Sequence, residues 1–138
     1  MSAIYLATAV STGSGRDGHV ETDDGRIRLD LAVPKSLGGT GAGTNPEQLV
    51  AMGYAACFSS ALGVTARRHK IDLPEVEVTC HVSLHRAEDG YSLSFEIVAR
   101  VPGLPLDQIE ALVTEAHTVC PYSRAFAHGA PTQARAAA

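Results

Sequence analysis

The chain has 138 residues, of which 45% are hydrophobic and 19% charged, a composition that suits one globular domain with its own core. A formal net charge of −4, and the lack of a basic run mixed with aromatic residues, argue against a nucleic-acid partner. The first residues lack a signal-peptide pattern, and three cysteines without CxxC fit neither a disulfide framework nor a zinc site. We therefore expect a single cytoplasmic domain over residues 1–138.

The N-terminal third predicts strands. Residues 4–10 are rich in β-forming types and predict a first strand. Residues 20–22 and 27–33 flank Asp23-Asp24-Gly25, which is a good hairpin signal. The glycine-rich residues 38–43 match neither GxGxxG nor a P-loop, so we interpret them as a flexible connector and not a phosphate site.

Residues 45–70 predict the central helix. Asn45 can cap its start, and no charged residue occurs between Glu47 and Arg67. Alanine, glycine, serine and threonine are too frequent for a typical membrane span, so we expect a buried helix. Burying all its faces needs more protein than one small chain supplies, which favours an intimate dimer.

The second half predicts a hairpin followed by helices. Alternating apolar residues indicate two strands, over 76–85 and 93–101, and helical spacing indicates a helix over 106–119. A short helix can restart over 123–127. The tail from residue 129 is alanine-rich, so any final strand there would be short and poorly anchored.

Two of the three cysteines, Cys57 and Cys120, lie on apolar helices that should pack together in one core. Packing could bring them within disulfide reach, at about 4.4–6.8 Å between Cα atoms. Cys80, on the inward face of a strand, is interpreted as a small buried hydrophobic residue. Burial raises the pKa of a thiol, so a reactive Cys57 needs a cation nearby. The start of its own helix is about three turns away, too far for the helix dipole to help.

Two further polar residues are open to interpretation. His117 lies one turn before Cys120, so a Cys–His couple is conceivable, but an ordinary core or surface histidine is the better interpretation. Arg16 lies in the turn Gly15-Arg16-Asp17-Gly18, where the residues alone indicate an exposed turn arginine.

Three blocks of the sequence resemble the Ohr/OsmC family of thiol peroxidases, and specifically its organic hydroperoxide resistance (Ohr) branch. They are GRDGHVETDDGRIRLDL at 15–31, GGTGAGTNPEQLVAMGYAACFSSAL at 38–62 and HTVCPYSRA at 117–125. The resemblance implies an α+β, OsmC-like fold, in which antiparallel sheets wrap around two central helices in an intertwined homodimer. It covers most of the chain, although family members usually finish with a hydrophobic strand that the present tail does not encode.

The resemblance also implies a chemistry. Cys57 would be the peroxidatic cysteine and Cys120 the resolving one, while Arg16 would activate the thiolate and Glu47 would orient Arg16. The family reduces organic and fatty-acid hydroperoxides to alcohols and takes electrons from dihydrolipoamide or lipoylated protein. It needs no metal, haem or flavin. Nucleic acid and membrane are not expected as partners.

Helix geometry constrains the implied site. In a continuous helix Glu47 and Cys57 are ten residues apart, about 15 Å along the axis. Either the helix breaks, near Gly53 for example, or Glu47 serves the Cys57 of a partner chain, and we predict a site at the subunit interface. Candidate walls of an apolar substrate pocket, with plain core packing as an equal alternative, are Met52, Tyr54, Phe58, Tyr122 and Phe126.

Other functions remain compatible with these residues. The chain could be an OsmC-type peroxidase, or a non-enzymatic thiol redox sensor or binding protein for an apolar ligand. It could also be a structural dimer whose cysteines only fill space.

Overall fold

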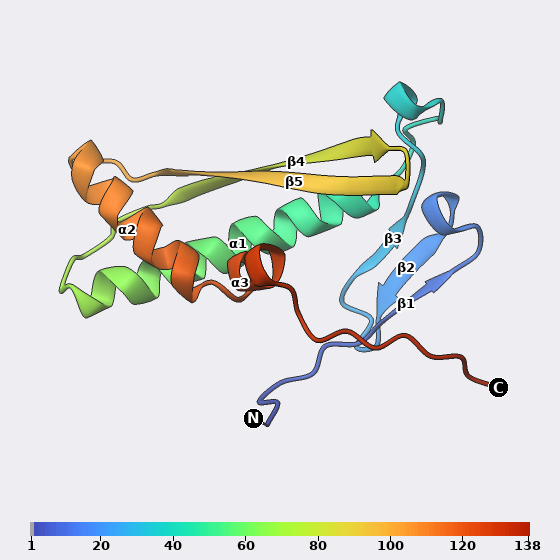
Figure 1. Ribbon diagram of the computed structural model, residues 1–138, viewed down its shortest axis with the longest axis horizontal. Helices are drawn as coiled ribbons and strands as arrows, with labels where there is room; N and C mark the ends of the chain where they lie inside the picture. The colour runs from blue at the N-terminus through green and yellow to red at the C-terminus, as the bar shows by residue number, and fades with distance from the viewer. Residues whose placement is uncertain (1) are drawn as a thin grey trace. The chain divides into compact units, whose positions relative to one another are not determined.

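Residues 2–138 are described by a computed structural model, in which the chain divides into one unit that reaches Leu49 and a second that begins at Val50. The division falls within the first turn of helix α1, Pro46–Arg68. Figure 1 labels the elements of both units, which are described separately here. A single domain over the whole chain stays a prediction.

The first unit contains a three-stranded antiparallel sheet of β1 (Ala9–Thr12), β2 (His19–Thr22) and β3 (Arg28–Asp30), in that order. The hairpin predicted around Asp23-Asp24-Gly25 is confirmed, because Glu21 pairs with Arg28 and Val20 with Leu29. Gly25 has φ +70°, a conformation that glycine adopts without strain. Asp24 accepts hydrogen bonds from the Arg26 backbone N–H and the Thr22 hydroxyl, and these two bonds lower the pKa of its carboxyl.

Two predicted boundaries in this unit are wrong. The first strand begins at Ala9 and not at Ile4, since residues 4–6 face solvent with exposed fractions of 81–102%. The third strand ends at Asp30, because Leu31 bridges to Thr44 and the Ala32 N–H donates to the Thr44 carbonyl. The chain thereby leaves the sheet edge and buries Leu31 and Ala32.

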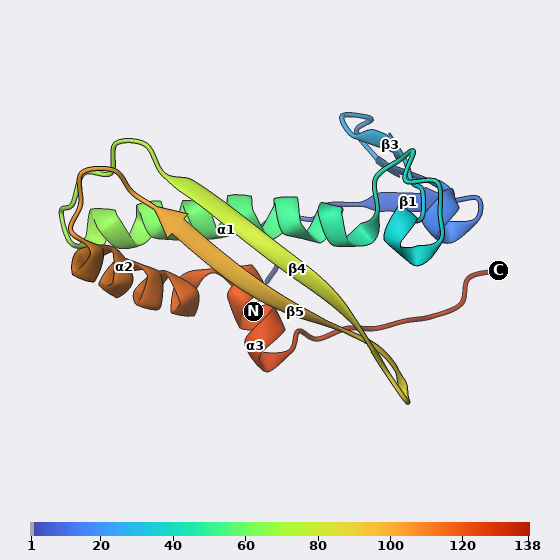
Figure 2. The ribbon, with the colours of Figure 1, turned by 90° about the horizontal axis from the view of Figure 1, so that it is seen from above.

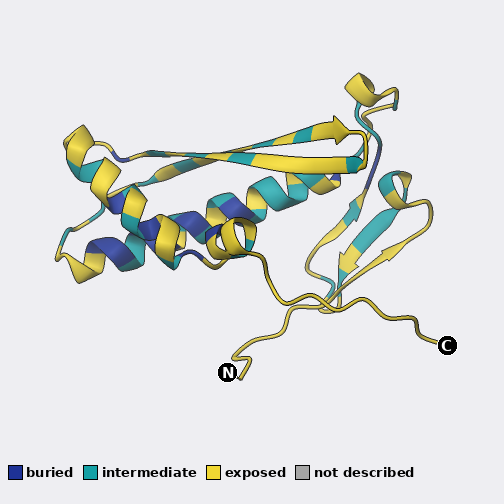
Figure 3. Cartoon of the chain, in the orientation of Figure 1, coloured by how far each residue is buried: buried dark blue, intermediate teal, exposed yellow. Residues whose placement is uncertain are grey.

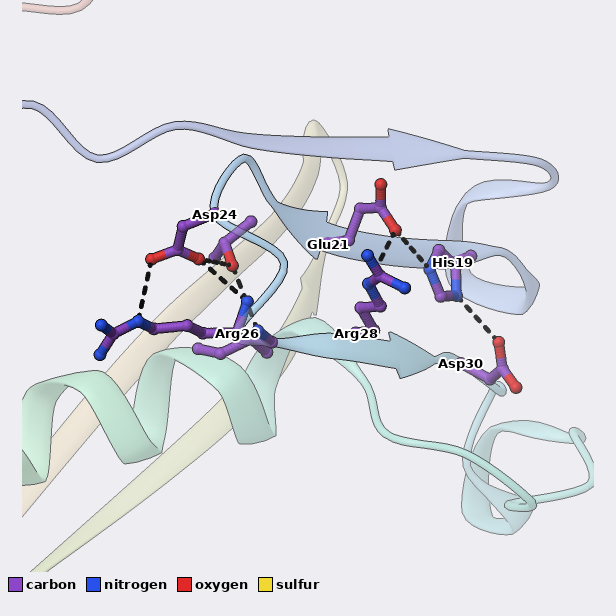
Figure 4. A network of polar contacts seen from close by, with 8 residues as sticks. His19, Glu21, Asp24, Arg26, Arg28 and Asp30 are labelled. Atoms are coloured by element: carbon purple, nitrogen blue, oxygen red, sulfur yellow. Dashed lines mark hydrogen bonds and ion pairs between the residues drawn. The ribbon is translucent and has the colours of Figure 1, made fainter.

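Charged side chains form a network on the hairpin of β2 and β3 (Figure 4). His19 Nδ1 lies 3.0 Å from Asp30 Oδ1, and this hydrogen bond raises the pKa of the imidazole. Arg28 and Glu21 approach to 3.8 Å across the two strands. These groups are exposed, so the network contributes little to stability.

Helix α1 begins as predicted. The Asn45 side chain accepts a hydrogen bond from the Gln48 N–H at 2.9 Å, and Arg67 and Arg68 occupy the last turn. The helix is continuous over 23 residues, so the alternative of a break near Gly53 is wrong. By length and composition alone α1 could cross a membrane, a test that core helices of soluble proteins also pass.

The second unit contains one long hairpin, β4 (Glu77–Ala87) and β5 (Gly90–Arg100), which confirms the two alternating segments of the sequence. Figure 1 shows the hairpin on one side of α1, and Figure 2 shows that it crosses the helix at an angle. Val78, Cys80, Phe95, Ile97 and Ala99 point inward to the core, while the residues between them are exposed. The alternation therefore reports one covered and one solvated face.

The remaining helices are α2 (Leu106–Val119), as predicted, and α3 (Pro121–His128). Cys120 lies between them with φ −61° and ψ 123°, ends α2 and caps α3. No strand follows α3, and residues 129–138 are exposed without regular structure. The doubt about a final strand is therefore confirmed in the part of the chain that the structure describes.

The core of the second unit lies where α1, α2 and the hairpin meet (Figure 3). It is formed by Tyr54, Phe58, Ala61, Leu62, Ala66, Leu112, Ala116 and Cys120. Only 33% of the most apolar 18-residue window of α1 is buried, so the single chain leaves much of the helix uncovered. Burial of every face, which the sequence predicts with the help of a partner chain, stays a prediction. The uncovered part includes Met52, which is 58% exposed.

Candidate active site

Two thiols meet inside the second unit. Cys57 lies in the middle of α1, and Cys120 lies at the joint between α2 and α3. Their Sγ atoms are 3.6 Å apart, with the Cys120 thiol donating to Cys57. Cys120 is fully buried, whereas Cys57 is half-buried. Both are free thiols, with no disulfide between them. The proximity expected from two packed apolar helices is therefore observed.

The surroundings of Cys57 act on its thiol in opposite directions. Burial raises its pKa above the ordinary value of 9.0, and the adjacent Cys120 raises it further. A hydrogen bond from the backbone N–H of Tyr122 lowers it. The net pKa is raised, so the groups of this unit alone leave Cys57 mostly protonated at neutral pH.

The contribution of Tyr122 is a feature that sequence reasoning missed. That reasoning considered the start of α1 and nearby charged or titratable side chains, whereas the sulfur accepts a backbone N–H from the first turn of a different helix, α3. Pro121 occupies the first position of α3 and has no N–H, so Tyr122 provides the first available donor. A proline directly after Cys120 was the available signal.

Arg16 and Glu47 form a pair in the first unit. Arg16 lies in a short 3-10 turn, Gly15–Asp17, and Glu47 in the first turn of α1. Two hydrogen bonds join the guanidinium to the carboxylate, at 2.8 Å and 2.6 Å. The Glu47 side chain is only 17% exposed, and this bidentate contact with Arg16 lowers the pKa of its carboxyl. Arg16 thus lies in a turn with 39% of its side chain exposed, as expected, but the residues alone did not predict its ion pair with Glu47.

The four residues implied by the resemblance therefore occur as two pairs, one pair in each unit. Because α1 is continuous, the ten residues between Glu47 and Cys57 correspond to about 15 Å along its axis. A carboxylate at that distance cannot share a site with the sulfur of its own helix. The continuous helix excludes the alternative of a break near Gly53, and a site completed by a partner chain stays a prediction.

The aromatic residues suggested as pocket walls belong mainly to one cluster. Tyr54 and Phe58 are 3% and 1% exposed and are core residues. The ring centroids of Tyr54 and Phe126 are 5.3 Å apart, and Tyr122 and Phe126 make an edge contact at 5.9 Å. Tyr122 and Phe126 remain 37% and 44% exposed, so they are available to a ligand as well as to the core.

A polar contact lies inside this apolar cluster. The hydroxyls of Tyr54 and Ser123 are 2.8 Å apart, and Ser123 is 1% exposed. Burial raises the pKa of the Tyr54 phenol, and the bond to Ser123 partly offsets that shift. Sequence reasoning had considered Tyr54 only as an apolar wall and had not singled out Ser123, although both stand three residues from a candidate cysteine.

The other candidates lie elsewhere. Cys80 is half-buried against the core and burial raises its pKa, as expected for a packing residue. His117 is exposed on α2. Among residues 2–138 no group of three or more His, Cys, Asp or Glu side chains could hold a metal ion. A cavity of about 200 Å³ lies beside His69 and Glu115, next to the C-terminal end of α1.

Comparison with known proteins identifies relatives of the chain. The family model for OsmC-like proteins matches residues 39–135. Organic hydroperoxide resistance protein OhrA of Bacillus subtilis is 43% identical over 132 residues, covering 91% of each chain. The organic hydroperoxide resistance protein of Xanthomonas axonopodis pv. citri is 42% identical over 124 residues, covering 88% of this chain and 87% of its own.

Solved structures agree with this assignment. An organic hydroperoxide resistance protein from Legionella pneumophila is 50% identical, with a TM-score of 0.87 and 93% of both chains covered. Its similarity confirms the expected α+β, OsmC-like fold with two antiparallel sheets. The chain therefore belongs to the OsmC-like family, within the branch of the organic hydroperoxide resistance proteins.

Proposed function

We propose that this protein is a cysteine-based peroxidase that reduces organic hydroperoxides, including alkyl and fatty-acid hydroperoxides, to alcohols. The observation that carries the proposal is the 3.6 Å separation of the Cys57 and Cys120 sulfurs, one half-buried and the other fully buried. Relatives at 42–43% identity bear the name of organic hydroperoxide resistance, which supports the substrate class.

The first step is an attack of the Cys57 thiolate on the outer oxygen of the hydroperoxide. The O–O bond breaks, and the inner oxygen leaves with the electron pair and takes up a proton to become the alcohol. Cys57 is oxidised to a sulfenic acid. Cys57 suits this role because it is the more exposed of the two thiols and can be reached from outside the core.

The second step forms a disulfide. Cys120 loses its proton and attacks the Cys57 sulfur, the S–O bond breaks, and hydroxide leaves to become water. A dithiol then reduces the disulfide and is itself oxidised, and we propose dihydrolipoamide or a lipoylated protein in this role. A cytoplasmic location fits the cycle, because that compartment keeps thiols reduced. No metal, haem or flavin takes part.

Activation of Cys57 requires a cation, since its own unit raises the pKa of the thiol. We propose that Arg16, oriented by its two hydrogen bonds to Glu47, supplies this charge at a subunit interface of a homodimer. Two observations support the arrangement. The continuous α1 separates Glu47 from the Cys57 of its own helix, and a large part of this helix, which carries no charge between Glu47 and Arg67, is uncovered in the single chain.

Substrate selectivity would come from the apolar surroundings of Cys57. Met52, Tyr122 and Phe126 are exposed by 58%, 37% and 44%, and they could contact an alkyl chain. Tyr54 and Phe58 would support them from the core. Cumene or tert-butyl hydroperoxide should therefore react faster than hydrogen peroxide, which gains nothing from apolar contacts.

The proposal is tested by hydroperoxide consumption with dihydrolipoamide, using wild type, Cys57→Ser and Cys120→Ser. We expect Cys57→Ser to abolish consumption and Cys120→Ser to block turnover after one equivalent. Cys80→Ser is the matched control and should keep wild-type activity, because Cys80 has a packing position on β4. A disulfide that forms without catalytic consumption would show a redox sensor instead. Equal activity of Cys57→Ser and wild type would refute the role of the thiol.

A further inference from the structure

A hydrogen bond links the two segments that carry the thiols. The hydroxyls of Tyr54 and Ser123 are 2.8 Å apart and both residues are buried, at 3% and 1% exposed. Tyr54 lies three residues before Cys57 on α1, and Ser123 lies three residues after Cys120 on α3. The bond therefore joins the two chain segments one helical turn away from the sulfur contact.

The position of Cys120 depends on how the first turn of α3 packs against α1. Cys120 has the extended φ and ψ values of a joint, so α2 does not extend through it and α3 begins directly after it. Tyr122 packs close to α1 at Gly53, where an added Cβ would lie 2.7 Å from the tyrosine hydroxyl. Tyr122 and Ser123 thus hold the first turn of α3 against α1 on the side of Cys57.

The bond between the two hydroxyls lies in an apolar environment. The Tyr54 ring is 5.6 Å from Phe95 and 5.3 Å from Phe126, measured between centroids. A buried hydroxyl without a hydrogen-bond partner is unfavourable. The two hydroxyls therefore favour the conformation in which they stay bonded to each other. The contact involves no sulfur atom, so oxidation of the thiols does not itself remove it.

We propose that Tyr54 and Ser123 are positioning residues that hold Cys120 against Cys57 while the disulfide is open. This role deepens the proposed peroxidase function and rests on it. A sulfenic acid on Cys57 has two fates. Attack by Cys120 forms the S–S bond and releases water, whereas attack of the sulfenate on a second hydroperoxide forms sulfinic acid and a second alcohol. Holding Cys120 in place favours the first fate.

The variant that tests this role is Tyr54→Phe/Ser123→Ala. It removes both hydroxyls together, so no buried polar group is left without a partner and the fold is preserved. Thr65→Val is the matched control, because Thr65 is also fully buried on α1 and its hydroxyl bonds only the Ala61 carbonyl of the same helix. The control removes a buried hydroxyl without touching the link to α3.

The first measurement does not require peroxidase activity. Each protein is equilibrated with mixtures of reduced and oxidised dithiothreitol, which gives the effective concentration of Cys120 at Cys57. We expect the effective concentration to fall about tenfold in the double variant, because small misplacements of reacting groups have effects of this size. In Thr65→Val we expect it to stay unchanged. Equal effective concentrations in wild type and double variant would overturn the proposal.

The second measurement follows the oxidised enzyme. The reduced proteins are treated with excess tert-butyl hydroperoxide, and the masses of disulfide and sulfinic forms are compared. We expect the ratio of sulfinic acid to disulfide to rise about tenfold in the double variant alone. An unchanged ratio would count against the positioning role. If wild type forms no Cys57–Cys120 disulfide with hydroperoxide, the proposed function fails, while the dithiothreitol equilibrium still decides the role of the two hydroxyls.

Discussion

The two units of the chain hold their functional side chains in different environments. Up to Leu49 the structure depends on strand pairing and on a few buried residues, including Leu31 and Ala32. Its surface ion pairs, such as Arg26 with Asp24, are exposed and add little. From Val50 on, it depends on a continuous apolar core. The first unit presents a charged pair, Arg16 and Glu47, and the second encloses two thiols.

Neither environment could provide both parts of the proposed chemistry. An apolar core protects a sulfenic acid from solvent and brings two sulfurs together, but it raises the pKa of the thiol that must ionise. A partly solvated loop can hold a guanidinium and a carboxylate at hydrogen-bonding distance without a large desolvation penalty. Under the proposed function, the thiol of a second unit would become reactive when it is supplied with the charge of a first unit, and the experiments below test this expectation.

Removing the charge should have the largest effect. We expect Arg16→Ala to lower the second-order rate constant with cumene hydroperoxide about 1,000-fold, equivalent to about 4 kcal/mol of activation free energy. Arg28→Ala, an exposed arginine of the same unit that pairs with Glu21 (Figure 4), is the control and should change the rate little. A similar loss in both variants would show a general effect of net charge.

The pH dependence of these rates sharpens the result. Without Arg16, burial keeps the pKa of Cys57 above 9.0, so the rate of the variant should continue to rise as pH increases beyond that value. Wild type should reach its plateau at lower pH. Parallel pH profiles would contradict a role of Arg16 in forming the thiolate.

Truncating the core should have the next largest effect. We expect Leu62→Ala, at a position with no exposed surface, to lower the free energy of unfolding by about 3 kcal/mol. Leu31→Ala, 7% exposed in the first unit, should lower it less because few buried side chains surround it. Urea denaturation of both variants measures the difference. Equal losses would show that the two units do not differ in how they are stabilised.

Acid should have the smallest effect. The lowered pKa of Glu47 means that its contribution to stability is present above the ordinary value of 4.5 and is lost as pH falls through the lower, folded-state pKa. With Arg16 39% exposed, we expect a contribution of about 1 kcal/mol or less. The difference in unfolding free energy between wild type and Glu47→Gln should therefore vanish below that pKa. A difference that persists in acid would point to packing.

Much of the fold was predictable from local patterns. Capping by Asn45, the start of α1 at Pro46, the hairpin of β4 and β5 and the bounds of α2 each follow from side chains close in sequence. The first strand was misplaced because β-forming residues such as Ile4 and Tyr5 find no partner strand among the described residues. The β propensity of a segment does not indicate whether a neighbouring strand is there to pair with it.

The candidate site was less accessible to prediction. The two cysteines could be paired from packing alone, and resemblance supplied Arg16 and Glu47. The Tyr122 N–H and the Tyr54–Ser123 bond arise because α3 turns back onto α1 after the joint at Cys120. That arrangement is set by tertiary packing, which leaves no periodic signal in the sequence.

The spacing of the two thiols along the chain has a consequence for the whole molecule. Cys57 and Cys120 are 63 positions apart, so a disulfide between them closes a loop that contains nearly half of the polypeptide. Closing a loop of that length reduces the entropy of the unfolded chain and stabilises the folded form by about 4 kcal/mol. In the proposed cycle the protein would alternate between a cross-linked form that is more stable and a reduced form that unfolds more readily. Reduction would prepare the protein for its next substrate and, at the same time, lower its resistance to denaturation.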